Sequence, residues 1–330
     1  MQQRFDAALD RAFDLAPAHA VAAIGPFAVR LHAASAGALA DWTDSLLLSE
    51  RSDADFSMAF VEADDRLLRD FVPDDQDQVL VLEDDGYLVL WQPHPNRLLY
   101  MFDVRTRRGL MWAAEGRAPP WVYSRPLLPA IHAATLDTDW TPVHAAGVGR
   151  DGRFLVLAGG GGAGKTTAAI ACAQEGWEYA GDDFVLVNAQ TGEVAPLYTS
   201  ARVRAGGPEA LAAFVEATTI ARTDRDGDVS YEVRLAGHPA GGNVRGGRIS
   251  AWLLPQRRGS QAPEFAPARR SVGYQSLILM TTLQLPFGRE AMASKILRMI
   301  GTAPVFTVDT GVSPALIPAA FQEFLARLPE

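Results

Sequence analysis

The sequence has little cysteine and no long apolar run, and both features bear on the cellular compartment in which the protein is expected. Cys172 is the only cysteine among 330 residues, so the chain cannot build a disulfide framework, which suits a reducing compartment. No apolar run approaches the roughly 18 residues that a membrane span needs. The acidic, amphipathic start MQQRFDAALDRAFDL is not typical of a signal peptide. These features predict a cytoplasmic protein that is not inserted in a membrane.

Positive charge is also in short supply. The formal net charge is −9, from 30 basic and 39 acidic residues. Such a balance argues against general binding to nucleic acid or to an anionic membrane surface. Hydrophobic residues make up 48% and charged residues 21% of the chain, which is typical of a globular protein.

Lysine is rarer still, because 28 of the 30 basic residues are arginine and only Lys165 and Lys295 are lysine. A chain that prefers arginine so strongly has kept a lysine at position 165. Chance is one explanation. The functional explanation is that a compact ammonium is required there, since arginine presents a bulkier planar fork.

The length allows about two domains, and the patterning changes along the chain. The first part contains apolar alternation typical of strands over 27–33 and 56–63, and a hairpin signal at Asp85-Gly86. We therefore predict a smaller, β-rich α+β domain over 1–122, with the stretch RAPPW at 117–121 as the boundary. Its expected role is recognition of an acceptor.

The remaining residues, 123–330, predict an α/β catalytic domain. Strands are expected on either side of Arg150-Asp151-Gly152 and over 249–256. Helices are expected over 124–138, 165–175, 289–300 and 314–327.

A complete G-x-x-x-x-G-K-[ST] pattern lies between the apolar strand FLVLA and a helix. In a P-loop the glycines let backbone N–H groups surround phosphate oxygens, and the helix N-terminus adds positive potential. The lysine can reach the β- and γ-phosphates, and the first threonine can complete a Mg²⁺ shell. The alternative is a glycine-rich turn with a coincidental GKT. The predicted nucleotide-binding residues are Gly159, Gly160, Gly161, Gly162, Ala163, Gly164, Lys165, Thr166 and Thr167.

Asp182 and Asp183 follow the P-loop, at the start of the predicted strand FVLV. One carboxylate could hold Mg²⁺ and the other could accept a proton from an attacking hydroxyl. The alternative is a turn pair that caps a strand. His144 lies 21 residues before Lys165, and a strand–turn–strand return could bring it beside the P-loop, although a lone histidine is more often a packed or surface residue.

Residues 143–187, VHAAGVGRDGRFLVLAGGGGAGKTTAAIACAQEGWEYAGDDFVLV, resemble the catalytic domain of the HPr kinase/phosphorylase family. That family shares its core fold with phosphoenolpyruvate carboxykinase and phosphorylates a serine hydroxyl of a protein with ATP and Mg²⁺. The resemblance implies that Asp183 is the general base, Asp182 lies near the metal with Thr166, His144 assists catalysis and Lys165 clamps phosphate.

Weaker similarity continues downstream. Arg202 stands where a basic residue is usual in these relatives, and VRGGRISAWLLP resembles a segment whose arginines approach the phosphates, which makes Arg245 and Arg248 candidate catalytic residues. A solvated arginine pair is the alternative. The glycine-rich signature with a metal-binding glutamate, which bifunctional members carry, is not found, and this argues against phosphorylase activity and against HPr itself as the substrate.

The sequence thus predicts an ATP- and Mg²⁺-dependent kinase acting on a serine or threonine of a peptide or small protein. Shorter relatives include kinases of lasso-peptide precursors, so a ribosomally made precursor peptide is the leading acceptor. Three alternatives remain: a kinase of a small-molecule alcohol, a nucleotide-sensing module without transfer, and a decarboxylating carboxykinase. The choice between ATP and GTP and the oligomeric state stay open, although the bifunctional relatives form hexamers, which makes a homo-oligomer one expectation.

Overall fold

The computed structural model describes residues 2–62, 65–69, 78–93, 97–119, 122–123, 125–204, 219–223, 229–235, 243–311 and 313–329. The chain divides into two compact units. The first unit comprises Met1–Asp137 and Leu285–Gly288, and the second comprises Thr138–Gln284 and Arg289–Glu330. The predicted boundary at 122/123 therefore falls inside the first unit. The reason is that helix α5 (Leu128–Thr135), all of whose residues are buried, packs against strand β7 (Leu98–Asp103) of that unit.

The first unit is built on an eight-stranded mixed sheet with the strand order β3-β1-β2-β4-β8-β7-β6-β5. Side chains alternate between the two faces of a strand, and both faces are covered. Ala59 and Val61 belong to a core with helix α1, whereas Phe60 stacks on Trp42 of helix α2 with ring centroids 4.1 Å apart. The elements are α1 (Gln2–Leu15), β1 (Ala18–Ile24), β2 (Phe27–Ala33), α2 (Ala36–Thr43), β3 (Leu47–Leu48), β4 (Phe56–Val61), α3 (Arg66–Arg69), β5 (Leu80–Asp84), β6 (Tyr87–Gln92), β7 (Leu98–Asp103) and β8 (Arg108–Ala113).

The second unit contains a nine-stranded mixed sheet whose main path runs β12-β10-β11-β18-β14-β13-β9, with β20 pairing to β18 and β19. A separate sheet has the order β15-β17-β16. The strands are β9 (Trp140–Val143), β10 (Ala145–Arg150), β11 (Arg153–Ala158), β12 (Glu178–Gly181), β13 (Val185–Asn188), β14 (Glu193–Ala195), β15 (Ser200–Arg204), β16 (Thr219–Thr223), β17 (Val229–Arg234), β18 (Gly247–Gln256), β19 (Glu264–Pro267) and β20 (Val305–Asp309).

Strand direction decides which chain segments meet at one edge of this sheet. β18 is parallel to both β11 and β20. β10 is antiparallel to β11 and to β12, so β12 runs in the same direction as β11. The segments that follow β11, β12, β18 and β20, and the residue that precedes β10, therefore lie at the same edge.

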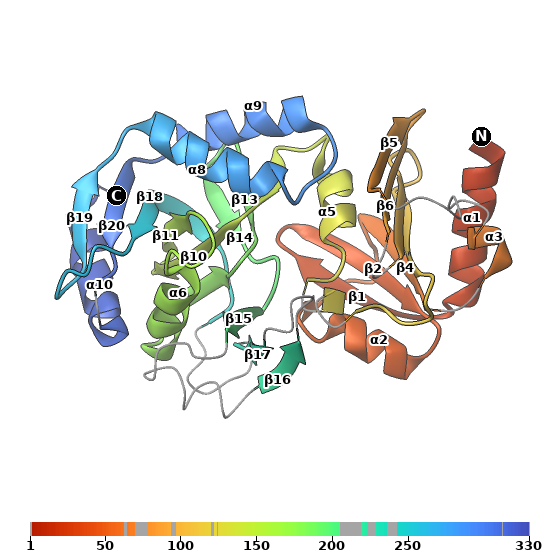
Figure 1. Ribbon diagram of the computed structural model, residues 1–330, viewed down its shortest axis with the longest axis horizontal. Coiled ribbons are helices and arrows are strands. Elements are labelled where there is room, and N and C mark those ends of the chain that lie inside the picture. The colour runs from red at the N-terminus through yellow and green to blue at the C-terminus, as the bar shows by residue number, and fades with distance from the viewer. Residues whose placement is uncertain are drawn as a thin grey trace. The chain divides into compact units, whose positions relative to one another are not determined.

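Helices cover both faces of the second sheet, as Figure 1 shows. α6 (Lys165–Gln174) and α10 (Ile317–Arg327) share a buried core with Leu155, Leu157 and Val308. α8 (Arg270–Thr282) and α9 (Arg289–Ile300) cover the other face, where Gly273 packs closely on Val305. Thus the helices predicted near 165, 289 and 314 are confirmed, whereas α8 and β20 were not predicted. No helix in the described ranges is long and apolar enough to cross a membrane.

Candidate functional site at the carboxyl edge of the second sheet

The predicted phosphate loop connects β11 to α6. Its residues Gly160 to Gly162 are exposed, and Gly162 and Gly164 adopt positive φ angles of 77° and 105°, which glycine accommodates readily. Gly164 is the N-cap of α6 and offers no side chain to the first turn. The N–H groups at the start of this helix consequently have no side-chain acceptor there, and such groups attract anions.

Lys165 turns back over this loop and is only 7% exposed. Its Nζ donates to the carbonyl oxygens of Gly159 at 2.7 Å and Gly160 at 3.2 Å. The same ammonium lies 3.1 Å from His144 Nε2. Burial lowers the pKa of Lys165, and the nearby carboxylates of Asp182 and Asp183 oppose that change.

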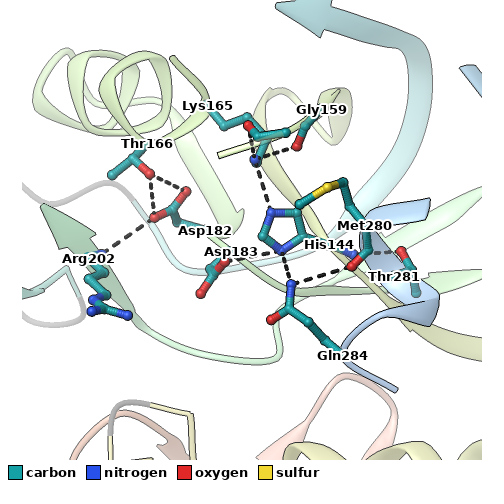
Figure 2. Close-up of polar contacts among 11 residues, drawn as sticks. His144, Gly159, Lys165, Thr166, Asp182, Asp183, Arg202, Met280, Thr281 and Gln284 are labelled. Atoms are coloured by element: carbon teal, nitrogen blue, oxygen red, sulfur yellow. Dashed lines mark hydrogen bonds and ion pairs between the residues drawn. The ribbon is translucent and has the colours of Figure 1, made fainter. Parts of the chain in front are cut away.

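His144 occupies the junction between β9 and β10, so it stands beside the loop that follows β11. Its backbone N–H donates to Thr281 Oγ1 at 3.2 Å, and its ring packs edge-on against Phe184. An ammonium can only donate, so the contact with Lys165 favours the neutral tautomer that accepts at Nε2 and carries its proton on Nδ1. Nδ1 lies 3.2 Å from Asp183 Oδ1. Figure 2 shows the resulting chain from Lys165 through His144 to Asp183.

Gln284 lies against the same ring. Its Nε2 is 3.3 Å from His144 Nδ1 and donates to the Met280 carbonyl at 3.4 Å. Since Nδ1 carries a proton in the tautomer described above, its acceptor is the Asp183 carboxylate and not the Gln284 amide nitrogen.

Asp182 points towards the first turn of α6. It is 3% exposed, and Thr166 Oγ1 lies 3.0 Å and 2.9 Å from its two carboxylate oxygens. The Arg202 N–H approaches at 3.4 Å. Burial, followed by the charge of Asp183, raises the Asp182 pKa to about 6, while the Thr166 hydrogen bond and Lys165 oppose the rise.

Asp183 occupies a left-handed backbone conformation, with φ of 70°. Such a conformation is uncommon for residues other than glycine, although aspartate and asparagine tolerate it best. The two aspartates follow β12 and precede β13. They therefore lie at the carboxyl end of a strand, a point that the sequence did not reveal because EYAG is short and only partly apolar.

Arg245 and Arg248 lie away from this cluster, which corrects the expectation that they approach the phosphates. Arg248 pairs with Arg153 at the start of β11. Arg153 is five residues from the carboxyl end of β11, so Arg248 lies roughly 16 Å from the edge at which the phosphate loop begins. Arg245 pairs with Glu178 at 3.3 Å and reaches the turn at Gly152. Both arginines thus belong to the opposite edge of the sheet.

Sequence reasoning missed the residues that α8 brings to the site. Thr281 supports the His144 backbone and Gln284 contacts its ring. Neither residue stands in a motif, and Thr281 is 137 residues from His144. Only the packing of α8 on the sheet brings them there.

Thr166 and Asp182 fit a magnesium ion. Both offer hard oxygen donors, and they face each other next to the predicted phosphate loop. Mg²⁺ commonly uses one or two protein ligands and completes its shell with water and phosphate oxygens. No group of three or more His, Cys, Asp or Glu side chains suited to a metal occurs among the residues described.

No family model matches this chain, and no curated protein matches it significantly.

Proposed function

We propose that the second unit is an ATP- and Mg²⁺-dependent kinase with a P-loop of the HPr kinase type, which phosphorylates a serine or threonine of a peptide or small protein. The observation that carries the proposal is the contact chain from Lys165 through His144 to Asp183, beside the Thr166–Asp182 pair. A phosphate-binding lysine, a metal-binding pair and a carboxylate base are the components that phosphoryl transfer requires.

Each side chain has a defined task in this reaction. The loop N–H groups and Lys165 hold the nucleotide phosphates, and Thr166 and Asp182 would hold Mg²⁺, which would neutralise phosphate charge. Asp183 accepts the acceptor's hydroxyl proton as that oxygen bonds to the γ-phosphorus. The bond from the γ-phosphorus to the β–γ bridging oxygen breaks, and ADP leaves. His144 orients the Asp183 carboxylate through Nδ1–H.

The test is transfer of labelled γ-phosphate from ATP to the small peptides encoded beside the gene, followed by intact mass. Asp183→Asn is the matched variant, because asparagine has the same shape and tolerates the left-handed backbone. Transfer should fall by about 10²- to 10⁴-fold, the usual contribution of a general base, with ATP affinity nearly unchanged.

The alternative functions give different results in the same assay. Phosphate appearing only on small alcohols would identify a metabolite kinase. Tight ATP binding without transfer to either class would identify a nucleotide-sensing module. Transfer by Asp183→Asn at the wild-type rate would refute the base assignment.

A further inference from the structure

The segments that follow β18 and β20 border the phosphate loop on the side away from His144. Leu157 of β11 pairs with Leu253 of β18, and Gln256 at the end of β18 pairs with Asp309 at the end of β20. The three strands are parallel, so their carboxyl ends meet at one edge. Arg257 follows β18, and Thr310 follows β20.

Close packing around Gly164 places both side chains against the loop. A Cβ atom added to Gly164 would lie 3.3 Å from Thr310 Oγ1 and 4.0 Å from Arg257 Nε. Gly164 is the N-cap of α6. The Arg257 guanidinium thus begins within reach of the helix N-terminus at which phosphate is expected.

The segment that carries Arg257, between β18 and β19, is held in place by Asp309. This carboxylate accepts hydrogen bonds from Ser260 N at 3.1 Å, Ser260 Oγ at 2.7 Å and Gly311 N at 3.1 Å. The bonds from Ser260 lower the Asp309 pKa to about 2. The Thr310 N–H also donates to the Gln256 carbonyl at 3.3 Å. The backbone on both sides of Arg257 is therefore tied to the end of β20, at Asp309 and Thr310.

The Arg257 side chain is exposed, and it makes no ion pair or hydrogen bond with any residue that the structure describes. Lys165, in contrast, is buried and contacts His144. In the sheet, β10 and β18 lie on opposite sides of β11. The phosphate loop thus has one cation on its β10 side and another on its β18 side.

We propose that Arg257 is a second phosphate-binding cation of this site, with Thr310 as the side chain against which the last glycine of the loop packs. The proposal rests on the proposed function, since it assumes that the loop holds a nucleotide triphosphate. A guanidinium donates two parallel hydrogen bonds to phosphate oxygens, so it adds orientation as well as charge. Arg257 thereby takes the place that the sequence had suggested for Arg245 and Arg248.

The experiment compares Mg-ATP affinity, measured by calorimetry, among the full-length wild type, Arg257→Ala, Arg257→Lys and Lys165→Ala. Arg257→Ala should weaken binding about tenfold or more, and Arg257→Lys should be intermediate, because lysine keeps the charge but loses the fork. Arg298→Ala is the control for net charge, since Arg298 is an exposed arginine of α9. Its affinity should equal that of the wild type.

Inorganic tripolyphosphate, used to displace a fluorescent ATP analogue, tests the chemistry of the contact. Its displacement constant should rise in Arg257→Ala by the same factor as the ATP dissociation constant. An unchanged constant would show that Arg257 does not bind phosphate and would overturn the proposal.

The outcomes separate this proposal from the kinase proposal. Wild-type protein that binds no nucleotide would refute the proposed function itself. Wild-type binding that is lost in Lys165→Ala but retained in Arg257→Ala would leave the nucleotide site intact and refute only the role of Arg257.

Discussion

The Lys165 ammonium lies 3.1 Å from His144 Nε2, and this contact favours one tautomer of the neutral imidazole. A cation that only donates forces Nε2 to accept. The remaining proton then faces Asp183 Oδ1 at 3.2 Å. A lysine of the predicted phosphate loop is therefore linked, through one imidazole, to the carboxylate that we propose as the base.

We expect His144 to be the Nδ1–H tautomer in the free protein. ¹⁵N NMR of the imidazole nitrogens should show a protonated Nδ1 and an unprotonated Nε2. In Lys165→Met, which keeps the length of the side chain but removes the donor, the Nε2–H form should become populated. The same tautomer in both proteins would mean that Asp183 alone orients the ring.

Thr166 should matter for metal binding through its hydroxyl alone. Thr166→Val has nearly the same shape but lacks the oxygen, so the Mg²⁺ concentration for half-maximal nucleotide binding should rise about tenfold or more. Thr166→Ser keeps the hydroxyl and is the matched control, with an expected change under about threefold. Equal Mg²⁺ dependence in the valine and serine variants would exclude Thr166 as a ligand.

Asp182 should make stability depend on pH. Its folded pKa of about 6 exceeds the ordinary value of 3.8, so between these values the folded protein holds a proton that the unfolded chain has lost. The free energy of unfolding should therefore fall as pH rises from about 4 to about 6, by on the order of 2–3 kcal/mol.

Asp182→Asn should remove that part of the pH dependence. The measurement is denaturant unfolding of both proteins, without Mg²⁺, at several pH values across this window. The difference between wild type and variant isolates Asp182 from other groups that titrate there. Parallel curves for the two proteins would contradict the raised pKa.

Arg245 and Arg248 should be dispensable for transfer. Arg245→Ala removes an ion pair between a half-exposed arginine and the mostly buried Glu178, and a pair with one solvated partner contributes about 1 kcal/mol to stability. The kcat/KM of either alanine variant should stay within about twofold of the wild type, since neither side chain lies at the loop edge. A large loss of kcat in either variant, with unchanged unfolding, would restore the role that the resemblance implied.

The sequence alone determined the local part of this site. The sequence predicted a strand–loop–helix unit that contains Gly159, Gly164 and Lys165. It could do so because glycine spacing and apolar runs act within a few residues of the chain. The expected helix start at Lys165 and the strands on either side of Asp151 are present. The hairpin at Asp85-Gly86 is likewise present, since turn chemistry is also local.

The tertiary structure alone decided which distant residues meet at that loop. Parallel pairing of β11, β18 and β20 brings Arg257 and Thr310 to the edge of the sheet where the loop lies. Arg248 stays near the start of β18, at the opposite edge. Packing of α8 delivers Thr281 to His144 across 137 residues of sequence. The physical reason is that register and direction belong to pairs of strands, and no property of a single segment reveals which partner it will have.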